Sequence, residues 1–382
     1  MSGMRISRRG VLTAAGLGLL GIGTAGCAPA TNSGGRSSAT TDGHAAMDRR
    51  LGAEWEPHEL TVMSWPTEAI WGEDLQDVRD DLASVAAAIA AYEPVVLLAS
   101  PGDEEDAAYA VGDDVEILTV PVDDLWARDT VPVFVEGPAG IEGVDLNFNG
   151  WGGKQFHEHD AGVGAAVLAE FGIPRVVASL VAEGGSLETD GQGTLLVTES
   201  SIVNDNRNPG LWRDEIEQRL MDLLGMRKVI WFDGVYDQDI TDAHIDSLVR
   251  FVAPGVVLLD VPGPGAPDDV WSRSSEQARS VLASATDAAG RPIEVVELPQ
   301  PDFAKIRGDG DDFLASYVNF FIANGAVFVP EFGDRRADRR AQDVLQEQFP
   351  DRDILPLAID TVASGGGGIH CATHDLPARP GE

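Results

Sequence analysis

Lysine is scarce in this chain, and the balance of charge is strongly one-sided. Only three lysines occur among 382 residues, at positions 154, 228 and 305, and lysine and arginine together number 27 against 63 acidic residues. The net charge at pH 7 is therefore −36. A field of this sign repels nucleic acid and attracts small cations. The composition thus argues against a nucleic-acid partner, although adaptation to a salty or extracytoplasmic setting is an alternative origin for most of the charge.

Cysteine is equally scarce, which excludes a framework of disulfides. The two cysteines are Cys27 and Cys371. Cys27 belongs to the targeting segment described below, so Cys371 has no disulfide partner in the mature monomer. Four glycines at 365–368 precede Cys371 closely and let the backbone turn and approach a ligand. A thiol in this position suits a nucleophile, and a buried core cysteine beside a glycine-rich turn is the alternative.

The chain also lacks an apolar run of comfortable membrane-spanning length. The apolar segment from Val11 to Ala25 is too short and too rich in glycine. Arg8 and Arg9 precede it in a pattern typical of a twin-arginine export signal. The segment ends at Cys27 in Thr-Ala-Gly-Cys, which resembles the lipobox of lipoproteins, although a threonine stands where Leu or Val is usual. We therefore expect a signal over residues 1–26, lipidation of Cys27 and an extracytoplasmic location.

Residues 27–52 have the composition of a flexible linker, and a single domain is expected over residues 53–379. The linker is rich in Ala, Ser, Thr and Gly without apolar periodicity. From Ala53 onward the composition is globular and no second linker follows. With 43% hydrophobic residues, the chain has enough apolar side chains for a large core.

Short apolar runs alternate with helical patterns in this domain. Strands are predicted at Val95–Leu98, Val115–Leu118 and Val256–Leu259, and helices at Leu75–Tyr92, Leu211–Leu224 and Asp338–Phe349. This alternation predicts an α/β architecture built from repeated modules. No sequence repeat is strong enough to give their number.

Two polar segments follow predicted strands. Acids, a tryptophan and an arginine occupy residues 123–129, after the apolar segment Val115–Val122. Such a cluster is unfavourable unless its members pair with one another or bind a ligand, and a solvated loop with a local ion pair is the alternative. Glu183 and two glycines follow the predicted strand Arg175–Val181. A simple turn accounts for that segment taken alone.

A third polar segment contains His244 and Asp246. Because the two residues are two positions apart, an extended segment would place both side chains on one face. A histidine that exchanges protons beside a carboxylate that binds a cation is a catalytic arrangement. It is also a common metal-ligand pattern, but the sequence shows no third clustered ligand and no strong metal motif. A surface histidine next to an acid is the remaining interpretation.

Together these segments supply a thiol, an imidazole, at least three carboxylates and a tryptophan. This set of groups fits chemistry on a cation with a planar electrophilic centre. A guanidinium has both properties, because carboxylates bind its N–H edges in pairs and a thiolate can attack its central carbon.

Nine segments in the same order carry a resemblance to a known family. They are Glu54-Trp55-Glu56-Pro57-His58, Ser64-Trp65-Pro66, Trp126-Ala127-Arg128-Asp129, Phe148-Asn149-Gly150-Trp151-Gly152-Gly153-Lys154, Glu183-Gly184-Gly185-Ser186, Asn206-Arg207-Asn208-Pro209, His244-Ile245-Asp246, Ser316-Tyr317-Val318-Asn319-Phe320 and Gly366-Gly367-Gly368-Ile369-His370-Cys371. The chain from about Ala53 to Ala378 resembles the agmatine deiminase and bacterial peptidylarginine deiminase family of the guanidine-modifying superfamily.

This resemblance implies a fold and a role for each matching residue. The implied fold is a single catalytic domain of the pentein type, a five-bladed α/β propeller of pseudo-fivefold ββαβ units with the site at its centre, without metal or organic cofactor. The implied roles are Cys371 as nucleophile, His244 as general acid and base, Asp129 and Asp246 as guanidinium ligands, Glu183 as the group that orients His244, Trp126 against the aliphatic stem of the substrate, and Asn319 in the pocket wall.

The activity that the resemblance implies is hydrolysis of a small cationic guanidine, with agmatine converted to N-carbamoylputrescine and ammonia through a covalent thiouronium. One position departs from the family pattern, because Ile240 stands four residues before His244 where an acid is usual. Deimination of peptidyl-arginine or another guanidine is therefore an alternative. A cationic-amine-binding lipoprotein without catalysis is a second alternative. We expect no nucleic-acid partner and membrane contact only through the lipid anchor, and we leave homo-oligomer formation open.

Overall fold

The computed structural model of the chain describes residues 49–138, 140–308, 310 and 312–379. The predicted signal at 1–26, the lipidation site Cys27 and most of the predicted linker lie outside the described residues. Regular structure begins at strand β1 (Arg50–Leu51), inside the last residues of the predicted linker, because β1 pairs with β5 (Val133–Gly137). Within the described ranges, no helix is long and apolar enough to cross a membrane.

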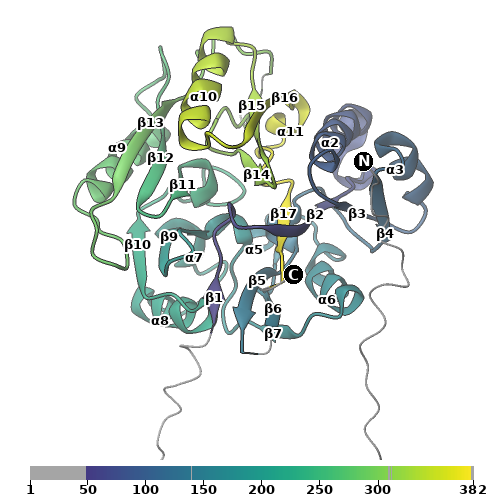
Figure 1. The fold of residues 1–382 in the computed structure, drawn as a ribbon, viewed down its shortest axis with the longest axis horizontal. Coiled ribbons are helices and arrows are strands. Elements are labelled where there is room, and N and C mark those ends of the chain that lie inside the picture. The colour runs from purple at the N-terminus through teal and green to yellow at the C-terminus, as the bar shows by residue number, and fades with distance from the viewer. Residues whose placement is uncertain (1–48, 139, 309, 311, 380–382) are drawn as a thin grey trace, which may run out of the picture. The chain divides into compact units, whose positions relative to one another are not determined.

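The strands form five separate sheets (Figure 1). Their orders are β1-β5-β6-β7, β10-β9-β8, β11-β12-β13, β14-β15-β16 and β17-β2-β3-β4. The bounds of the other strands are β2 His58–Ser64, β3 Val95–Ala99, β4 Val115–Thr119, β6 Gly140–Asp145, β7 Arg175–Val177, β8 Glu188–Thr189, β9 Thr194–Thr198, β10 Lys228–Phe232, β11 Val249–Ala253, β12 Val256–Val261, β13 Glu294–Pro299, β14 Phe321–Ala323, β15 Ala326–Glu331, β16 Asp353–Ala358 and β17 His374–Pro377. The predicted α/β class is confirmed.

The same pattern of pairing recurs in all five sheets. A central strand has an antiparallel neighbour on one side and a parallel neighbour on the other, as β12 has β11 and β13. A helix crosses between the central and parallel strands, which is the connection that parallel neighbours require. These helices are α2 Leu75–Ala90, α6 Asp160–Phe171, α8 Arg213–Leu224, α9 Val270–Leu282 and α10 Arg335–Gln348.

The fifth sheet joins the two ends of the described chain. Strand β17 near the carboxyl end pairs with β2 near the amino end, with His374 opposite Val62. This pairing brings the segment after Cys371 beside the segment that contains Glu54. Residues separated by more than 300 positions in the sequence therefore meet in one place.

The helices lie towards the outside of the structured part of the chain, and most strands lie further in (Figure 1). Each helix follows an apolar period; in α2 the buried positions include Val78, Leu82, Val85 and Ile89. The predicted strands and helices are confirmed with shifted ends. Helix α10 begins three residues before its predicted start, because the Asp334 side chain accepts a hydrogen bond from the first-turn amide of Arg336.

One predicted strand is much shorter than expected. The segment 175–181 forms strand only over β7. The Ala178 amide still bonds to Asp145 at the end of β6, and the Asn147 side chain donates to the carbonyls of Ala178 and Leu180. The Asn208 side chain accepts a hydrogen bond from the backbone amide of Val181 and donates one to its carbonyl. At Val181 the Asn208 side chain therefore makes the backbone hydrogen bonds that a neighbouring strand would otherwise make.

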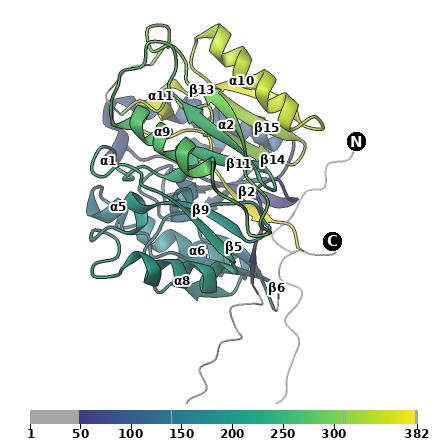
Figure 2. The ribbon, with the colours of Figure 1, turned by 90° about the vertical axis from the view of Figure 1, so that its left-hand side faces the viewer.

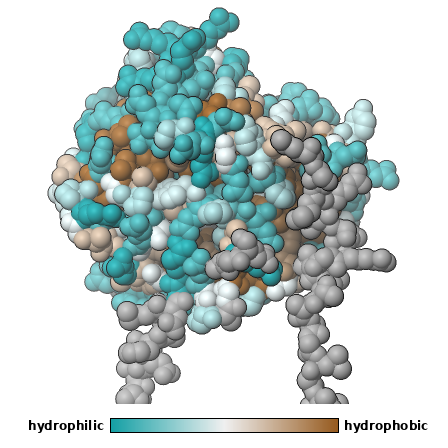
Figure 3. Space-filling model, viewed as in Figure 1, coloured by the Kyte–Doolittle hydropathy of each residue, from teal (hydrophilic) through white to brown (hydrophobic). Residues whose placement is uncertain are grey.

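The surface is mainly hydrophilic on the face seen in Figure 3, as the acidic composition requires. A view from the side places the short helices α1 (Glu68–Trp71) and α5 (Gly150–Gly153) on one side of the molecule and β6 on the other (Figure 2). Both short helices belong to the loops that carry site residues.

Candidate active site

The glycine run before Cys371 brings its backbone against two pocket residues. It follows helix α11 (Asp360–Ser364). A Cβ added at Gly367 would lie 2.2 Å from a ring carbon of Trp126, and one at Gly368 would lie 2.4 Å from Asn319 Oδ1. Such distances exclude any side chain at these positions unless the neighbours move. The close approach seen here is to protein side chains, and the predicted approach to a ligand stays a prediction.

Cys371 is a free thiol, and its side chain contacts Asn319 and Asp246. The side-chain amide of Asn319 donates to Sγ at 3.2 Å, and its carbonyl oxygen accepts the Cys371 backbone amide at 3.3 Å. The thiol lies 3.5 Å from Asp246 Oδ2. Burial first, and then the carboxylates of Asp246 and Asp129, raise the thiol pKa well above its usual value. A cation placed beside Sγ would lower that pKa.

His244 is buried among carboxylates. Its Nε2 lies 3.2 Å from Glu183 Oε2, and its Nδ1 lies 3.7 Å from Asp129 Oδ2. Burial alone lowers the pKa of the imidazole, but Asp129, Glu183 and Asp246 outweigh it and raise the pKa to about 9. His244 is therefore an imidazolium at neutral pH. The interpretation of His244 as a surface residue is wrong, since it is 3% exposed.

The backbone that carries His244 is not extended. Asp242 and Ala243 have positive φ angles of 61° and 63°, and His244 precedes a 3-10 helix, η4 (Ile245–Ser247). The predicted extended segment is thus wrong, and the two-residue period of a strand does not place the side chains. His244 and Asp246 nevertheless reach the same site, because the sharp turn before His244 and the tight helix after it redirect both.

The two aspartates have different partners. Asp129 lies in helix α4 (Ala127–Thr130) and accepts hydrogen bonds from the Gly185 amide and from Trp151 Nε1, both at 2.9 Å. Asp246 Oδ2 lies 2.7 Å from His370 Nδ1. The other oxygen, Asp246 Oδ1, is buried and has no hydrogen-bond partner. A buried unpaired carboxylate oxygen is costly, and it marks a place where a donor can bind.

Gly185 lies between the predicted site residues. A Cβ added there would be 2.7 Å from His244 Nδ1, 2.9 Å from Asp129 Oδ1 and 3.1 Å from Asp246 Oδ2. The turn interpretation of this segment agrees with its backbone, which forms a 3-10 helix, η3 (Gly184–Ser186). The Glu183 side chain at its start still reaches His244. Three ionisable groups from two segments thus converge around one position without a side chain.

The segment 123–129 is buried rather than a solvated loop. Arg128 bonds to Glu54 at 2.9 Å and to Asp375 at 3.2 Å. Trp126 is 6% exposed, and its ring centroid lies 6.4 Å from that of Trp71. Both tryptophans belong to the apolar cluster that also contacts Cys371 and Ile240. This cluster forms an apolar wall next to the thiol.

The sequence reasoning missed three charged residues around the site, although each lies in a segment that carried the family resemblance. Arg207 is fully buried and bonds to Glu183 at 2.9 Å and to Asp242 at 2.7 Å. His370 and Glu54 contact each other at 2.9 Å behind Asp246. A motif shows that such residues occur together, but only a contact shows what each one does.

No group of three or more His, Cys, Asp or Glu side chains among the described residues is arranged to hold a metal ion. The histidines and carboxylates of the site instead neutralise one another in pairs.

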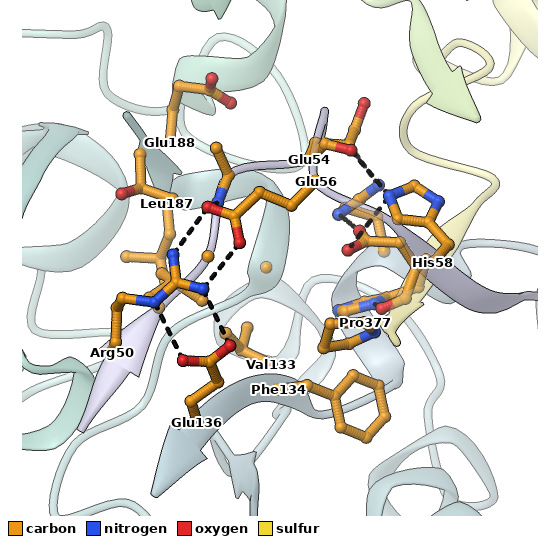
Figure 4. A pocket seen from close by; sticks show the side chains of 18 of the residues that line it. Arg50, Glu54, Glu56, His58, Val133, Phe134, Glu136, Leu187, Glu188 and Pro377 are labelled. Atoms are coloured by element: carbon orange, nitrogen blue, oxygen red, sulfur yellow. Dashed lines mark hydrogen bonds and ion pairs between the residues drawn. The ribbon is translucent and has the colours of Figure 1, made fainter. Parts of the chain in front are cut away.

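A separate cavity of about 70 Å³ lies behind these residues. It has room for several waters at about 10–15 Å³ each. Arg50 bonds to Glu56 and Glu136 at its wall (Figure 4). Its lining includes Glu54 and His370, but none of Cys371, His244, Asp129 and Asp246 is among the described residues that line it. The cavity therefore adjoins the candidate site without containing its reactive groups.

Comparison with known proteins places these residues in a family context. The sequence profile of the Porphyromonas-type peptidyl-arginine deiminase family matches residues 50–377. An agmatine deiminase of Medicago truncatula is 38% identical over 359 residues, which cover 85% of this chain and 96% of that protein. An agmatine deiminase of Stutzerimonas stutzeri is 37% identical, with 85% of this chain and 95% of that protein covered.

A solved structure of Enterococcus faecalis agmatine deiminase has a similar fold. It superposes with a TM-score of 0.81 at 32% identity and covers 86% of this chain and 96% of its own. The family profile, over residues 50–377, includes every predicted catalytic and substrate-binding residue.

Proposed function

Because the chain belongs to the Porphyromonas-type peptidyl-arginine deiminase family, we propose that it hydrolyses agmatine to N-carbamoylputrescine and ammonia. It is a hydrolase that acts on the C–N bond of an amidine group. The observation that carries the proposal is Asp246, whose Oδ1 is buried without a partner while its Oδ2 lies 3.5 Å from the Cys371 thiol. One guanidinium N–H can bind this oxygen while the central carbon lies beside the sulfur.

The apolar wall beside the thiol supports an alkyl guanidine as substrate. Trp126, Trp71 and Ile240 pack in the cluster that Cys371 contacts, and they suit the methylene chain of agmatine. The relatives at 37–38% identity are agmatine deiminases. A protein that only binds cationic amines has no need of a thiol beside a guanidinium ligand. These observations favour agmatine over peptidyl-arginine and over binding without catalysis.

The first half of the reaction forms a covalent bond. Asp129 and Asp246 bind the guanidinium, and its positive charge favours loss of the Cys371 proton to solvent. The thiolate attacks the guanidinium carbon, and the His244 imidazolium, oriented by Glu183, gives its proton to the leaving nitrogen. The C–N bond breaks, ammonia departs, and a thiouronium remains on Cys371.

The second half uses the same imidazole in its neutral form. His244 takes a proton from water, and the resulting hydroxide attacks the thiouronium carbon. The tetrahedral adduct collapses with cleavage of the C–S bond, which releases the ureido product and the thiolate. Asn319 Nδ2, 3.2 Å from Sγ, can donate a hydrogen bond to that thiolate.

Two finer features of the molecule belong to the same proposal. The five sheets are the blades of a five-bladed propeller with the site at its centre, supported by the shared strand–strand–helix–strand order and by the pairing of β17 with β2. The chain is exported by the twin-arginine route and anchored to the outer side of the membrane through Cys27. The pattern of residues 5–27 in the sequence supports both the export and the anchor. Homo-oligomer formation stays a prediction.

Ammonia release over a panel of guanidines tests the activity. Agmatine should give the highest kcat/KM, followed at a distance by free arginine and peptidyl-arginine, and Cys371→Ala should release no ammonia from any of them. With His244→Ala, mass spectrometry after a substrate quench should find the added mass on the peptide that bears Cys371, because no base activates the water. Turnover by Cys371→Ala would contradict the thiol mechanism.

A further inference from the structure

His370 lies directly before the proposed nucleophile, and both of its ring nitrogens face carboxylates. It is 2% exposed. Its Nδ1 lies 2.7 Å from Asp246 Oδ2, and its Nε2 lies 2.9 Å from Glu54 Oε2. An ionised carboxylate can only accept hydrogen bonds, so both contacts are satisfied only when both nitrogens carry protons. The geometry therefore describes an imidazolium between two anions.

The anion on the far side of His370 is itself held in place. Glu54 lies 2.9 Å from Arg128 and 3.0 Å from Arg250. Burial by itself raises the pKa of Glu54, but Arg250, His370 and Arg128 outweigh it and keep the pKa well below its usual value. Charges thus alternate from the arginines through Glu54 and His370 to Asp246. Such a buried series keeps each member ionised and fixed in one geometry.

The series determines which part of Asp246 is available to a substrate. Oδ2 is already in contact with His370 Nδ1 and lies near Cys371 Sγ. Oδ1 has no partner. A guanidinium that enters the site can therefore bind to Asp246 through Oδ1 without displacing an existing bond.

We propose that His370 is a positioning residue for guanidinium capture, whose imidazolium holds Asp246 by Oδ2 as an anion and leaves Oδ1 to accept from the substrate. This inference rests on the function proposed above. His370 touches neither the reacting carbon nor the leaving group, and it acts through Asp246.

A buried histidine near Cys371 is not necessarily charged. His374 lies four residues further on and is also buried, at 4% exposure. Its Nδ1 lies 3.1 Å from the backbone oxygen of Asp375, and its Nε2 has no partner. Burial first, and then Arg128, lower the pKa of His374 to about 3, so this histidine is neutral. His370, in this turn, and His374, the first residue of β17, thus have different surroundings, because only His370 is placed between two carboxylates within 3 Å.

The charge on Asp246 depends on His370 more than on any other neighbour. Burial raises the pKa of Asp246, and the bond to His370 is the largest of the effects that lower it below its usual value. The titratable and charged groups that face Asp246 or His370 are Glu54, Arg128, Asp129, Glu188, His244, Arg250, Cys371 and His374. Loss of the His370 charge should therefore raise the pKa of Asp246.

The test compares His370→Gln with His374→Gln, two neutral replacements of buried histidines four residues apart. His370→Gln should lower kcat/KM for agmatine by about 10- to 100-fold, the range for a hydrogen bond between charged groups. The loss should appear mainly in KM, because the interaction binds substrate before the chemical step. The lower part of the acid limb of the kcat/KM profile, which follows protonation of Asp246 and lies below the part set by the Cys371 thiol, should move to higher pH. His374→Gln should keep the wild-type profile.

Glu54→Gln provides a second variant in case His370→Gln fails to fold. Its two arginines keep other partners, since Arg128 lies 3.2 Å from Asp375 and Arg250 lies 2.7 Å from Glu188. Glu54→Gln should raise KM and move the acid limb in the same direction by a smaller amount. Circular dichroism and the thermal midpoint identify variants that have folded.

Each outcome bears on the proposal. A folded His370→Gln or Glu54→Gln with a wild-type acid limb and KM would overturn it, as would an equal shift in His374→Gln. Failure of both variants to fold would assign the buried series to stability alone and would also overturn it. If the wild type itself releases no ammonia from any guanidine, the proposed function fails, and that result is distinct from an active wild type with an unaffected His370→Gln.

Discussion

At the scale of single residues, the two proposed guanidinium ligands differ in how firmly they hold their charge. Asp129 is bonded to neutral donors from Trp151 and Gly185, and burial is the largest of the effects that raise its pKa. Asp246 is also buried, but its bond to His370 and the charges of His370, His244 and Arg250 together outweigh burial, and its pKa is lowered. Asp246 therefore stays ionised more readily than Asp129. The ionisation of Asp129 depends more on the positive charges of His244 and of the substrate.

Replacement of either aspartate by asparagine should weaken substrate binding. Asp246→Asn and Asp129→Asn each remove a charge-assisted bond that is worth about 1.5–3 kcal/mol, so kcat/KM should fall by about 10- to 150-fold for every guanidine tested. Asp160→Asn is the matched control, because Asp160 is buried in helix α6 and outside the site. Its pKa is raised to about 7, mainly by burial, so a neutral side chain should be tolerated. Near-wild-type activity of Asp246→Asn would show that the pocket is mis-assigned.

The pH dependence of the reaction should follow the coupled titration of Cys371 and His244. Attack needs a thiolate and protonation of the leaving group needs an imidazolium, yet the thiol pKa is raised well above its usual value and the His244 pKa is about 9. Both groups are thus protonated in the free enzyme at neutral pH, so kcat/KM should rise with pH and form a bell whose maximum lies at or above about pH 9.

A bound cation lowers the thiol pKa, so the acid limb of the kcat profile should lie at lower pH than that of kcat/KM. Initial rates from pH 6 to 10.5 measure both. The charge of His244 also affects folding. Its contribution to the stability of the fold is complete below the unfolded pKa of about 6.5 and is lost as the pH rises through its folded pKa of about 9. An optimum at or below pH 7 for kcat/KM would contradict this charge assignment.

At the scale of elements, short irregular segments position the site and the regular ones support them. His244 follows two residues with positive φ, Glu183 begins the 3-10 helix η3, and Cys371 follows the glycine run. Each of these segments is joined to a strand of a different sheet. A loop between rigid elements can place a side chain that the period of a strand or helix would direct elsewhere.

A methyl group at Gly185 should disrupt the site without disturbing the fold. The added Cβ would lie 2.7 Å from His244 Nδ1 and 2.9 Å from Asp129 Oδ1, and displacement of reacting groups by about 1 Å can reduce the rate about 100-fold. We therefore expect Gly185→Ala to lower kcat for agmatine by about that factor, measured by ammonia release.

Gly162→Ala is the control for this change. Gly162 is an exposed glycine of helix α6 with nothing within 4 Å of an added Cβ. Alanine in an exposed helix interior should add about 0.5–1 kcal/mol of stability and leave activity unchanged. If Gly185→Ala retained wild-type kcat, the convergence of three ionisable groups on this position would have no catalytic meaning.

At the scale of the whole molecule, the site gathers residues from five sheets. Glu54 precedes β2, Asp129 precedes β5, Glu183 precedes β8, His244 precedes β11, Asn319 precedes β14 and Cys371 precedes β17, and of these strands only β2 and β17 share a sheet. Because β17 pairs with β2, the last of these segments lies beside the first. The thiol can take its position only when the end of the chain has joined the sheet formed by its beginning.

The proposed anchor also concerns the molecule as a whole. If Cys27 carries lipid, the protein should fractionate with membranes, and Cys27→Ser should release it or stop processing of the signal. Cys371→Ala, which leaves the signal intact, should fractionate like the wild type. Quantitative immunoblots of soluble and membrane fractions measure the difference. Equal solubility of wild type and Cys27→Ser would indicate secretion without an anchor.

Several features were determined by the sequence alone, because they depend on local patterns. Apolar runs and helical periods placed β3, β4, β12, α2 and α8 to within a few residues at their ends. The four glycines before Cys371 predicted a close approach of the backbone to a ligand, and the structure shows its close approach to Trp126 and Asn319. The order of the polar motifs indicated the family and a guanidine as substrate. Residue type and spacing suffice for such inferences, since they require no distant contact.

Other features were decided only by the tertiary structure, because they depend on contacts between distant segments. The predicted strand to residue 181 ended early when Asn208 took the place of a neighbouring strand. His244 and Asp246 reach one site through a turn and a 3-10 helix rather than along a strand. His370 lies between Asp246 and Glu54, and Glu54 is more than 300 residues before it in the sequence. A titratable side chain takes its charge from whatever folding places next to it, and no local pattern contains that information.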